Sequence, residues 1–227
     1  LTDAFGRATP LDSSLYGVQQ RMLQKGLSDW SVDVGAVRQA YGIKSFEYAN
    51  DPAASGTWRY GATNEVTVET HAESTRGLVT AGGGAVVLLG PKAGVATAAV
   101  ARSSYEGNDG SLLNLGYSWR NNRFNFAVEG TRTYSDYRDV ASLNGSPVPQ
   151  RSGQASVGYG TELLGSFGLT YLYLRYPTEQ ASRFVTAYWS RSISSNGSIN
   201  LSVNHDLNDR RNSSVYVGFS WYLDGVS

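Results

Sequence analysis

The sequence has no cysteine, a single methionine and only six prolines in 227 residues. The lack of cysteine excludes disulfide bonds and thiolate metal ligands. Nineteen basic residues balance nineteen acidic ones, so no net charge recruits nucleic acid, and none is expected as a partner. No run approaches the roughly 18 apolar residues of a membrane-spanning helix, which excludes a helical membrane protein but leaves a membrane β-barrel open.

Signatures of catalysis are missing as well. The sequence has no G-x-S-x-G elbow and no H-E-x-x-H motif. The stretch AGGGAVVLLGPKAG, residues 81–94, lacks the G-K-[ST] ending of a phosphate loop. A strand bend or bulge at Gly82–Gly84 and a turn at Gly90–Gly94 explain it better. We therefore expect no enzyme, no catalytic residue and no cofactor.

What the sequence has instead is alternation of apolar and polar residues, kept up for about ten residues at a time. Soluble strands are usually about five or six residues long, whereas a tilted strand crossing a bilayer needs roughly nine to eleven. The pattern predicts an all-β protein: an antiparallel transmembrane β-barrel, or a segment of one, with about twelve strands. The clearest predicted strands are residues 28–38, 65–73, 112–120, 123–131, 197–207 and 213–223; weaker ones are 56–62, 78–89, 95–104, 154–161, 166–176 and 183–193.

The predicted connections alternate between longer and shorter segments. The longer ones are residues 40–55, 105–110, 137–151, 177–180 and 208–213, and the shorter ones lie at Thr63, Asn121, Glu162 and Gly197. Outer-membrane barrels have this asymmetry, with short periplasmic turns and long external loops. Tyrosines and tryptophans also fall mostly toward strand ends, as in the aromatic belts of membrane proteins.

The alternation separates two faces, of which the polar one is predicted to face a water-filled lumen and the apolar one to face lipid. The predicted lumen-facing residues are Glu65, Glu69, His71, Glu73, Asn125, Glu129, Asn200 and Asn204. The predicted lipid-facing residues are Val66, Val68, Phe124, Phe126, Leu201, Val203, Val217 and Phe219.

The histidines raise the question of a metal or catalytic site. Glu69, His71 and Glu73 follow one another about 7 Å apart on one strand face, so a neighbouring strand would have to complete a metal site. A solvated lumen wall is the better interpretation, and no metal is expected. His205 is predicted to lie on a polar face beside Asp206, where a general base without a placed nucleophile is weak evidence for catalysis.

Three stretches of the chain resemble the outer-membrane usher of chaperone–usher fimbriae. They are DAFGR at 3–7, LYGVQQRMLQKGLSDWSVDVGAVRQAYG at 15–42 and RYGATNEVTVETHAE at 59–73. Ushers show a D-x-x-G-R element, then an aromatic and LL-x-x-G-L-x-D-[YW]-S leading to G-x-x-R-x-x-Y-G, then RYG-x-[ST]-x-x-[LV]-T-x-E. After about residue 110 only the barrel character is similar.

The resemblance implies a piece of a larger protein. Residues 1–14 would be the end of a plug domain or a linker into the barrel, and residues 15–227 a segment of a transmembrane barrel of about twenty-four strands. It implies a multi-pass protein of the bacterial outer membrane that secretes and assembles pilin subunits, delivered by a periplasmic chaperone, through strand exchange. The implied partners are pilin subunits, chaperone–pilin complexes, outer-membrane lipid and the remainder of the usher chain.

Two other classes of protein fit the alternation. One is a self-contained outer-membrane porin or autotransporter-type translocator, because an even number of strands permits closure. The other is a secreted carbohydrate-binding β-sandwich with surface aromatics. If the chain is half of a larger barrel, the strands at 28–38 and 213–223 are unpaired edges, which favour aggregation or dimerisation of the isolated chain.

Overall fold

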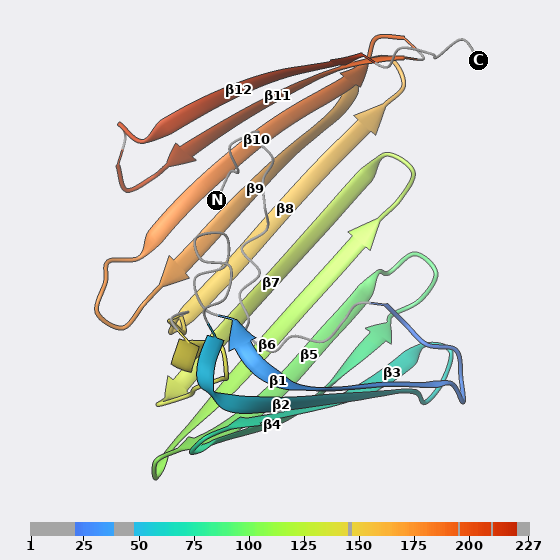
Figure 1. The fold of residues 1–227 in the computed structure, drawn as a ribbon. Coiled ribbons are helices and arrows are strands. Elements are labelled where there is room, and N and C mark those ends of the chain that lie inside the picture. The colour runs from blue at the N-terminus through green and yellow to red at the C-terminus, as the bar shows by residue number, and fades with distance from the viewer. Residues whose placement is uncertain (1–20, 39–47, 145–146, 195, 210, 222–227) are drawn as a thin grey trace, which may run out of the picture.

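The computed structural model describes residues 21–38, 48–144, 147–194, 196–209 and 211–221. The strands in these ranges form one antiparallel sheet. Its twelve strands are hydrogen-bonded in chain order from β1 to β12 (Figure 1). They are β1 Ser28–Arg38, β2 Tyr48–Gly61, β3 Val66–Thr75, β4 Leu78–Leu88, β5 Val95–Tyr105, β6 Asn108–Arg120, β7 Phe124–Ser135, β8 Arg151–Thr161, β9 Gly165–Arg175, β10 Ser182–Ser192, β11 Gly197–Asp206 and β12 Ser213–Trp221. A short 3-10 turn, η1 at Ser142–Asn144, interrupts the β7–β8 connection. The all-β prediction and the twelve predicted strands are confirmed.

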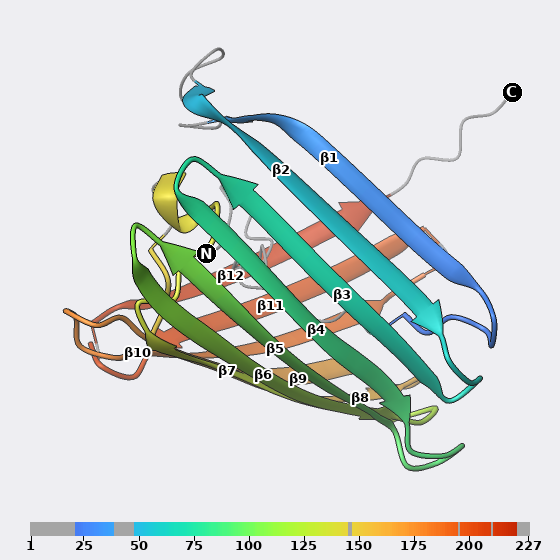
Figure 2. The same cartoon turned by 90° about the horizontal axis from the view of Figure 1, so that it is seen from below.

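The sheet curls into an open trough. Figure 2 shows β1 and β2 on one side of the trough and β10 to β12 on the other. Within the described residues, β1 pairs only with β2 and β12 only with β11, so the two edges are not joined. The predicted unpaired edges are therefore confirmed. Their side chains are well exposed, for example Val34 at 76% and Val217 at 69%.

One predicted loop, residues 40–55, is partly strand. β2 begins at Tyr48 and carries Asn50, Asp51 and Pro52, residue types that are depleted in strands. Pro52 pairs with Ala36 next to a register shift between Ala36 and Arg38, where a residue without an amide proton is tolerated. Residues 39–47 lie outside the described residues, as do the predicted plug or linker at 1–14 and the end of the predicted strand at 213–223.

The asymmetry of the connections is only partly as predicted. One end of the sheet carries the connections 62–65, 89–94, 121–123, 162–164 and 193–196, and we call it the turn end. The opposite end carries the connection 136–150 but also two tight hairpins. The predicted loop 105–110 is one of them, because Glu106 and Gly107 both adopt positive φ (49° and 83°) and close a two-residue turn. The predicted turn at Gly90–Gly94 is present, with Leu89 N donating to Gly94 O.

A strand bend or bulge is predicted at Gly82–Gly84, and of the two the bulge is wrong. β4 pairs with β3 and with β5 through these glycines without a break in register. Gly84 stands opposite Glu69, and Gly82 stands opposite His71. The glycines therefore leave space beside two long polar side chains on the same face of the sheet.

Most of the buried hydrophobic residues in the described ranges lie in two small clusters rather than in one central core. Val86 and Ala99 form the first, against which Met22 packs. Ala101, Leu112 and Tyr137 form the second cluster, and Val148 packs against it. Each cluster joins the sheet to a segment of chain that lies across it, which we call the entry segment (residues 21–27) and the inner loop (residues 136–150, described except for 145–146).

Candidate functional site: the inner wall of the sheet

Strand pairing assigns the predicted polar and apolar residues to opposite faces. We call the face that carries the entry segment and the inner loop the inner wall. The predicted lumen-facing residues on this wall are Glu69, His71, Glu73, Asn125, Glu129, Asn200 and Asn204. Glu65 lies in the turn just before β3 and is exposed, rather than on the strand. The eight predicted lipid-facing residues occupy the opposite, outer face; that this face meets lipid stays a prediction.

His205 is an exception to its predicted placement. It shares a face with Val203 rather than with Asp206, because side chains alternate along a strand. Its Nδ1 lies 2.7 Å from Ser213 Oγ of the neighbouring strand. His205 therefore belongs to the outer face, where a hydroxyl partner satisfies the ring near the strand end.

A buried ion pair fixes the entry segment on the inner wall. Arg59 of β2 and Glu69 of β3 stand opposite each other, and Arg59 Nε donates to Glu69 Oε2 at 3.0 Å. Both side chains are almost completely buried, at 4% and 3% exposed. Arg59 Nη2 also donates to the carbonyl of Arg21. The guanidinium thus joins the sheet to the segment that covers it.

The backbone of the entry segment completes this attachment. Leu23 N donates to Thr67 Oγ1 at 2.8 Å, and Gly26 N donates to Gly61 O at 2.8 Å. Gly61 permits the close approach, since a Cβ there would lie 2.1 Å from Gln24 O. The sheet residues in these contacts all belong to the stretch 59–73: Arg59, Gly61, Thr67 and Glu69. This stretch therefore binds the entry segment, which belongs to the stretch 15–42.

The inner loop is attached to the same wall at the opposite end of the strands. Thr80 Oγ1 of β4 donates to Arg138 O at 3.0 Å, and Arg138 N donates to Ser103 Oγ of β5 at 2.8 Å. Val140 N donates to Glu73 Oε1 of β3 at 2.9 Å. Three neighbouring strands therefore hold the backbone of Arg138 and Val140, the residues on either side of Asp139.

Asp139 stands at the centre of these contacts. Its side chain accepts a hydrogen bond from Ser142 N at 2.7 Å through Oδ1, while Oδ2 is buried and has no hydrogen-bond partner among the described residues. The residue is 2% exposed. Burial raises the pKa of Asp139; the hydrogen bonds from Ser142 lower it and the negative charge of Glu73 raises it further.

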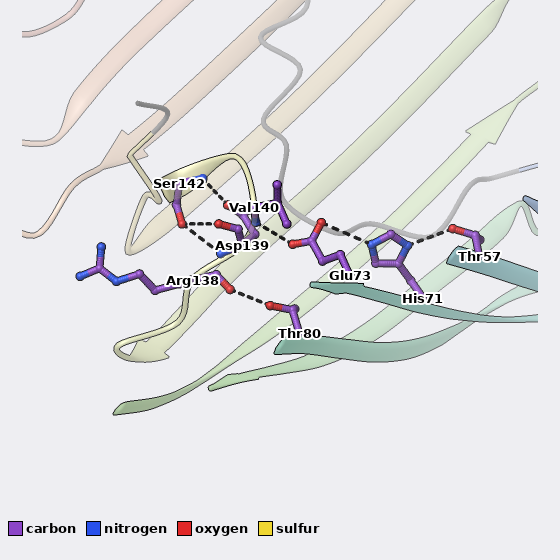
Figure 3. Close-up of polar contacts among 8 residues, drawn as sticks. All are labelled: Thr57, His71, Glu73, Thr80, Arg138, Asp139, Val140 and Ser142. Atoms are coloured by element: carbon purple, nitrogen blue, oxygen red, sulfur yellow. Dashed lines mark hydrogen bonds and ion pairs between the residues drawn. The ribbon is translucent and has the colours of Figure 1, made fainter. Parts of the chain in front are cut away.

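Glu73 and His71 continue this network along β3. Glu73 Oε2 lies 3.8 Å from His71 Nε2, and His71 Nδ1 lies 2.9 Å from Thr57 Oγ1 of β2. Figure 3 shows Thr57, His71, Glu73 and Thr80 projecting from the strands toward the loop residues Arg138 to Ser142. Among the described residues, no three His, Asp or Glu side chains are grouped so that they could hold a metal ion.

The rest of the inner wall carries amides and hydroxyls that bond across strands. Asn114 Nδ2 donates to Glu129 Oε1 at 2.8 Å and to Thr131 Oγ1 at 2.9 Å. Thr186 Oγ1 donates to Asn204 Oδ1 at 2.7 Å. Such side chains keep the surface hydrated and leave few apolar anchors on it.

The outer face has the opposite character. Aromatic rings from neighbouring strands contact one another there, such as Phe124 and Tyr159 with ring centroids 4.6 Å apart. Phe124, Phe126, Val203, Val217 and Phe219 of the predicted lipid-facing set are all exposed. No helix in the described ranges is long and apolar enough to span a membrane.

A single antiparallel sheet of long strands with one polar and one apolar face defines the class: the fold of outer-membrane β-barrel proteins. The chain is similar to the P pilus usher (PapC) translocation pore, with a TM-score of 0.63 and 16% identity over 89% of this chain. It is also similar to OccK3 (OpdO) of Pseudomonas aeruginosa, with a TM-score of 0.55 and 14% identity over 90% of this chain. No protein-family model and no curated protein sequence matches the chain.

The shares of the two neighbours differ. This chain covers 44% of the usher pore and 68% of OccK3. The sheet described here therefore spans less than half of the usher chain that it resembles.

Proposed function

We propose that this chain is a segment of an outer-membrane usher pore, which secretes and assembles pilin subunits delivered by a periplasmic chaperone. The observation that carries the proposal is the attachment of the entry segment to β2 and β3. Residues of the two longer usher-like stretches, at 15–42 and 59–73, are bound to each other through Arg59, Thr67 and Glu69. The two stretches that carry the resemblance in sequence therefore also contact each other in the fold.

The open sheet also supports the proposal. A trough of twelve strands with two exposed edges has the form of half of a barrel of about twenty-four strands. Barrel diameter grows with strand number, and barrels of 16 to 18 strands already leave an aqueous channel, so about twenty-four strands leave room for a folded domain. The TM-score of 0.63 with 44% of the usher pore covered agrees with a sheet that makes up about half of such a barrel.

The inner wall suits the passage of a folded protein. Polar side chains on it are hydrogen-bonded across strands, as in Asn114 with Glu129 and Thr186 with Asn204, and they keep these parts of the wall hydrated. A pilin subunit can then slide while its own strand exchange with the next subunit drives assembly. The outer face, with its exposed valines and phenylalanines, would meet the lipid of the bacterial outer membrane.

The experiment is complementation. The complete reading frame that contains this chain is expressed, with a chaperone and its pilins, in cells that lack ushers, and surface fibres are counted by electron microscopy. We expect fibres with the intact reading frame and none when β1–β12 are deleted. Correctly inserted protein that never supports fibres with any chaperone–pilin pair would contradict the proposal.

A second candidate is a self-contained porin-like channel, favoured by the similarity to OccK3, of which the chain covers 68%. In that case the chain alone closes, with β1 paired to β12. Planar-bilayer recordings distinguish the two, because a closed barrel of twelve strands gives uniform single-channel steps, whereas an open half-barrel gives no defined conductance.

A further inference from the structure

We propose that the inner loop is a proton-operated latch on the inner wall, held against β3–β5 when Asp139 is protonated and loosened when Asp139 and Glu73 are both ionised. The latch requires only that the inner wall lines a lumen. It does not depend on whether that lumen belongs to an usher or to another barrel.

The geometry places a carboxyl group where its charge is poorly compensated. Asp139 is 2% exposed, and no group in the part of the chain that the structure describes donates a hydrogen bond to its Oδ2. A buried, unpaired carboxylate oxygen costs free energy, whereas the protonated form reduces that cost. Glu73 supplies a second acidic side chain beside the loop. Its Oε1 accepts a hydrogen bond from the amide of Val140, the residue that follows Asp139. Docking of the loop therefore brings two acidic side chains together.

Within the described ranges, the other groups around Asp139 do not supply a compensating cation. β4 and β5 present the hydroxyls of Thr80 and Ser103 to the loop. On β3, His71 lies beside Glu73 at 3.8 Å, on the far side from the loop. Arg138 precedes Asp139, but its side chain points away, as Figure 3 shows, and lies 4.0 Å from Asp136.

The direction of the pH effect follows from linkage. The pKa of Asp139 is raised in the docked loop, first by burial. In a released, solvated loop the pKa returns to the ordinary value of about 3.9. The docked state therefore binds the proton more tightly, and docking gains as the pH falls through the raised pKa. Above that pKa the docked state loses about tenfold in population for each unit by which the two pKa values differ.

The consequence is a change in the free cross-section of the lumen. When docked, the inner loop lies across the wall of β3–β5 and covers Leu112 and Ala101 with Tyr137. When loosened, it exposes this patch and Glu73 to the lumen.

The test measures hydrogen exchange at the Val140 amide, the donor to Glu73, by NMR of the full chain in detergent micelles. Protection factors, corrected for the intrinsic exchange rate, are compared between about pH 4 and about pH 7.5, on either side of a pKa raised above 3.9. We expect protection of Val140 to fall as the pH rises. The Leu88 amide, which donates to Glu65 O at the turn end at 2.8 Å, serves as the internal reference and should not change.

Variants separate the latch from a general pH effect. Asp139→Asn should keep the low-pH protection of Val140 at every pH, and Glu73→Gln, which retains an acceptor, should move the transition to lower pH. Glu65→Gln, the same substitution at the other end of the same hairpin, should behave as the wild type. A protection factor of Val140 that is flat with pH, an equal change at Leu88, or an unmoved transition in Glu73→Gln would each overturn the proposal. The last result decides even if Asp139→Asn fails to fold.

Discussion

Replacement of Glu69 by glutamine is the sharpest test of how the entry segment is held. The substitution keeps the size of the side chain and an acceptor oxygen, so it removes charge without creating a cavity. It leaves the Arg59 guanidinium buried at 4% exposure without its carboxylate. Loss of one partner from a buried ion pair costs about 3–5 kcal/mol, and the retained acceptor places this case near 3 kcal/mol.

The assay is urea unfolding in lipid vesicles, followed by the fluorescence of the five tryptophans. Glu65→Gln, at an exposed position on the same hairpin, is the control and should change the free energy of unfolding by less than about 0.5 kcal/mol. In a double-mutant cycle with Arg59→Met, the two losses should not add, because both substitutions remove the same ion pair. A loss below about 1 kcal/mol for Glu69→Gln, or strict additivity, would refute the reasoning.

Further predictions concern the inner loop and the two faces. Gly110→Ala should dislodge the inner loop, because a Cβ there would lie 1.9 Å from Tyr137 N. Trypsin should then cleave after Arg138 several-fold faster. The control is Gly35→Ala, which has nothing within 4 Å of the added Cβ and should leave the cleavage rate unchanged. Cleavage that stays slow in Gly110→Ala would show that the loop is not seated as described. Since the chain has no cysteine, single variants can be labelled cleanly in membranes: Asn200→Cys should react with an aqueous thiol reagent and Leu201→Cys should be protected, and the reverse pattern would contradict the assignment of faces.

The sheet itself was readable from the alternation of side chains. Ser28–Arg38 and Gly197–Asp206 follow the period-two pattern closely, because each strand has one polar and one apolar face. The same pattern put Glu69 and Leu201 on opposite faces. It failed where composition and pairing disagree: Asn50 to Pro52 look like loop residues, but pairing with β1 extends the strand through them.

The contacts on the inner wall were not readable in the same way. Nothing in the local pattern says that Arg59 and Thr67 bind residues 38 and 44 positions away, since such contacts depend on how the whole sheet curls. The stretch at 137–151 was predicted as an external loop, because its polar and proline-rich composition does not reveal that it folds inward. One weak signal is present in the sequence: Glu69 and His71 are polar positions that stand opposite Gly84 and Gly82 of β4, and these glycines leave space on that face for partners from elsewhere.

The central claim is that β1 and β12 are edges of a larger barrel rather than partners of each other. Disulfide scanning tests it directly, with one cysteine placed along β1, such as Val34→Cys, and one along β12, such as Val217→Cys, in the complete protein in its membrane. The account predicts no disulfide between β1 and β12 of the same chain in any register. Efficient formation of an intramolecular disulfide in a consistent antiparallel register would show that the twelve strands close on themselves, and would contradict it.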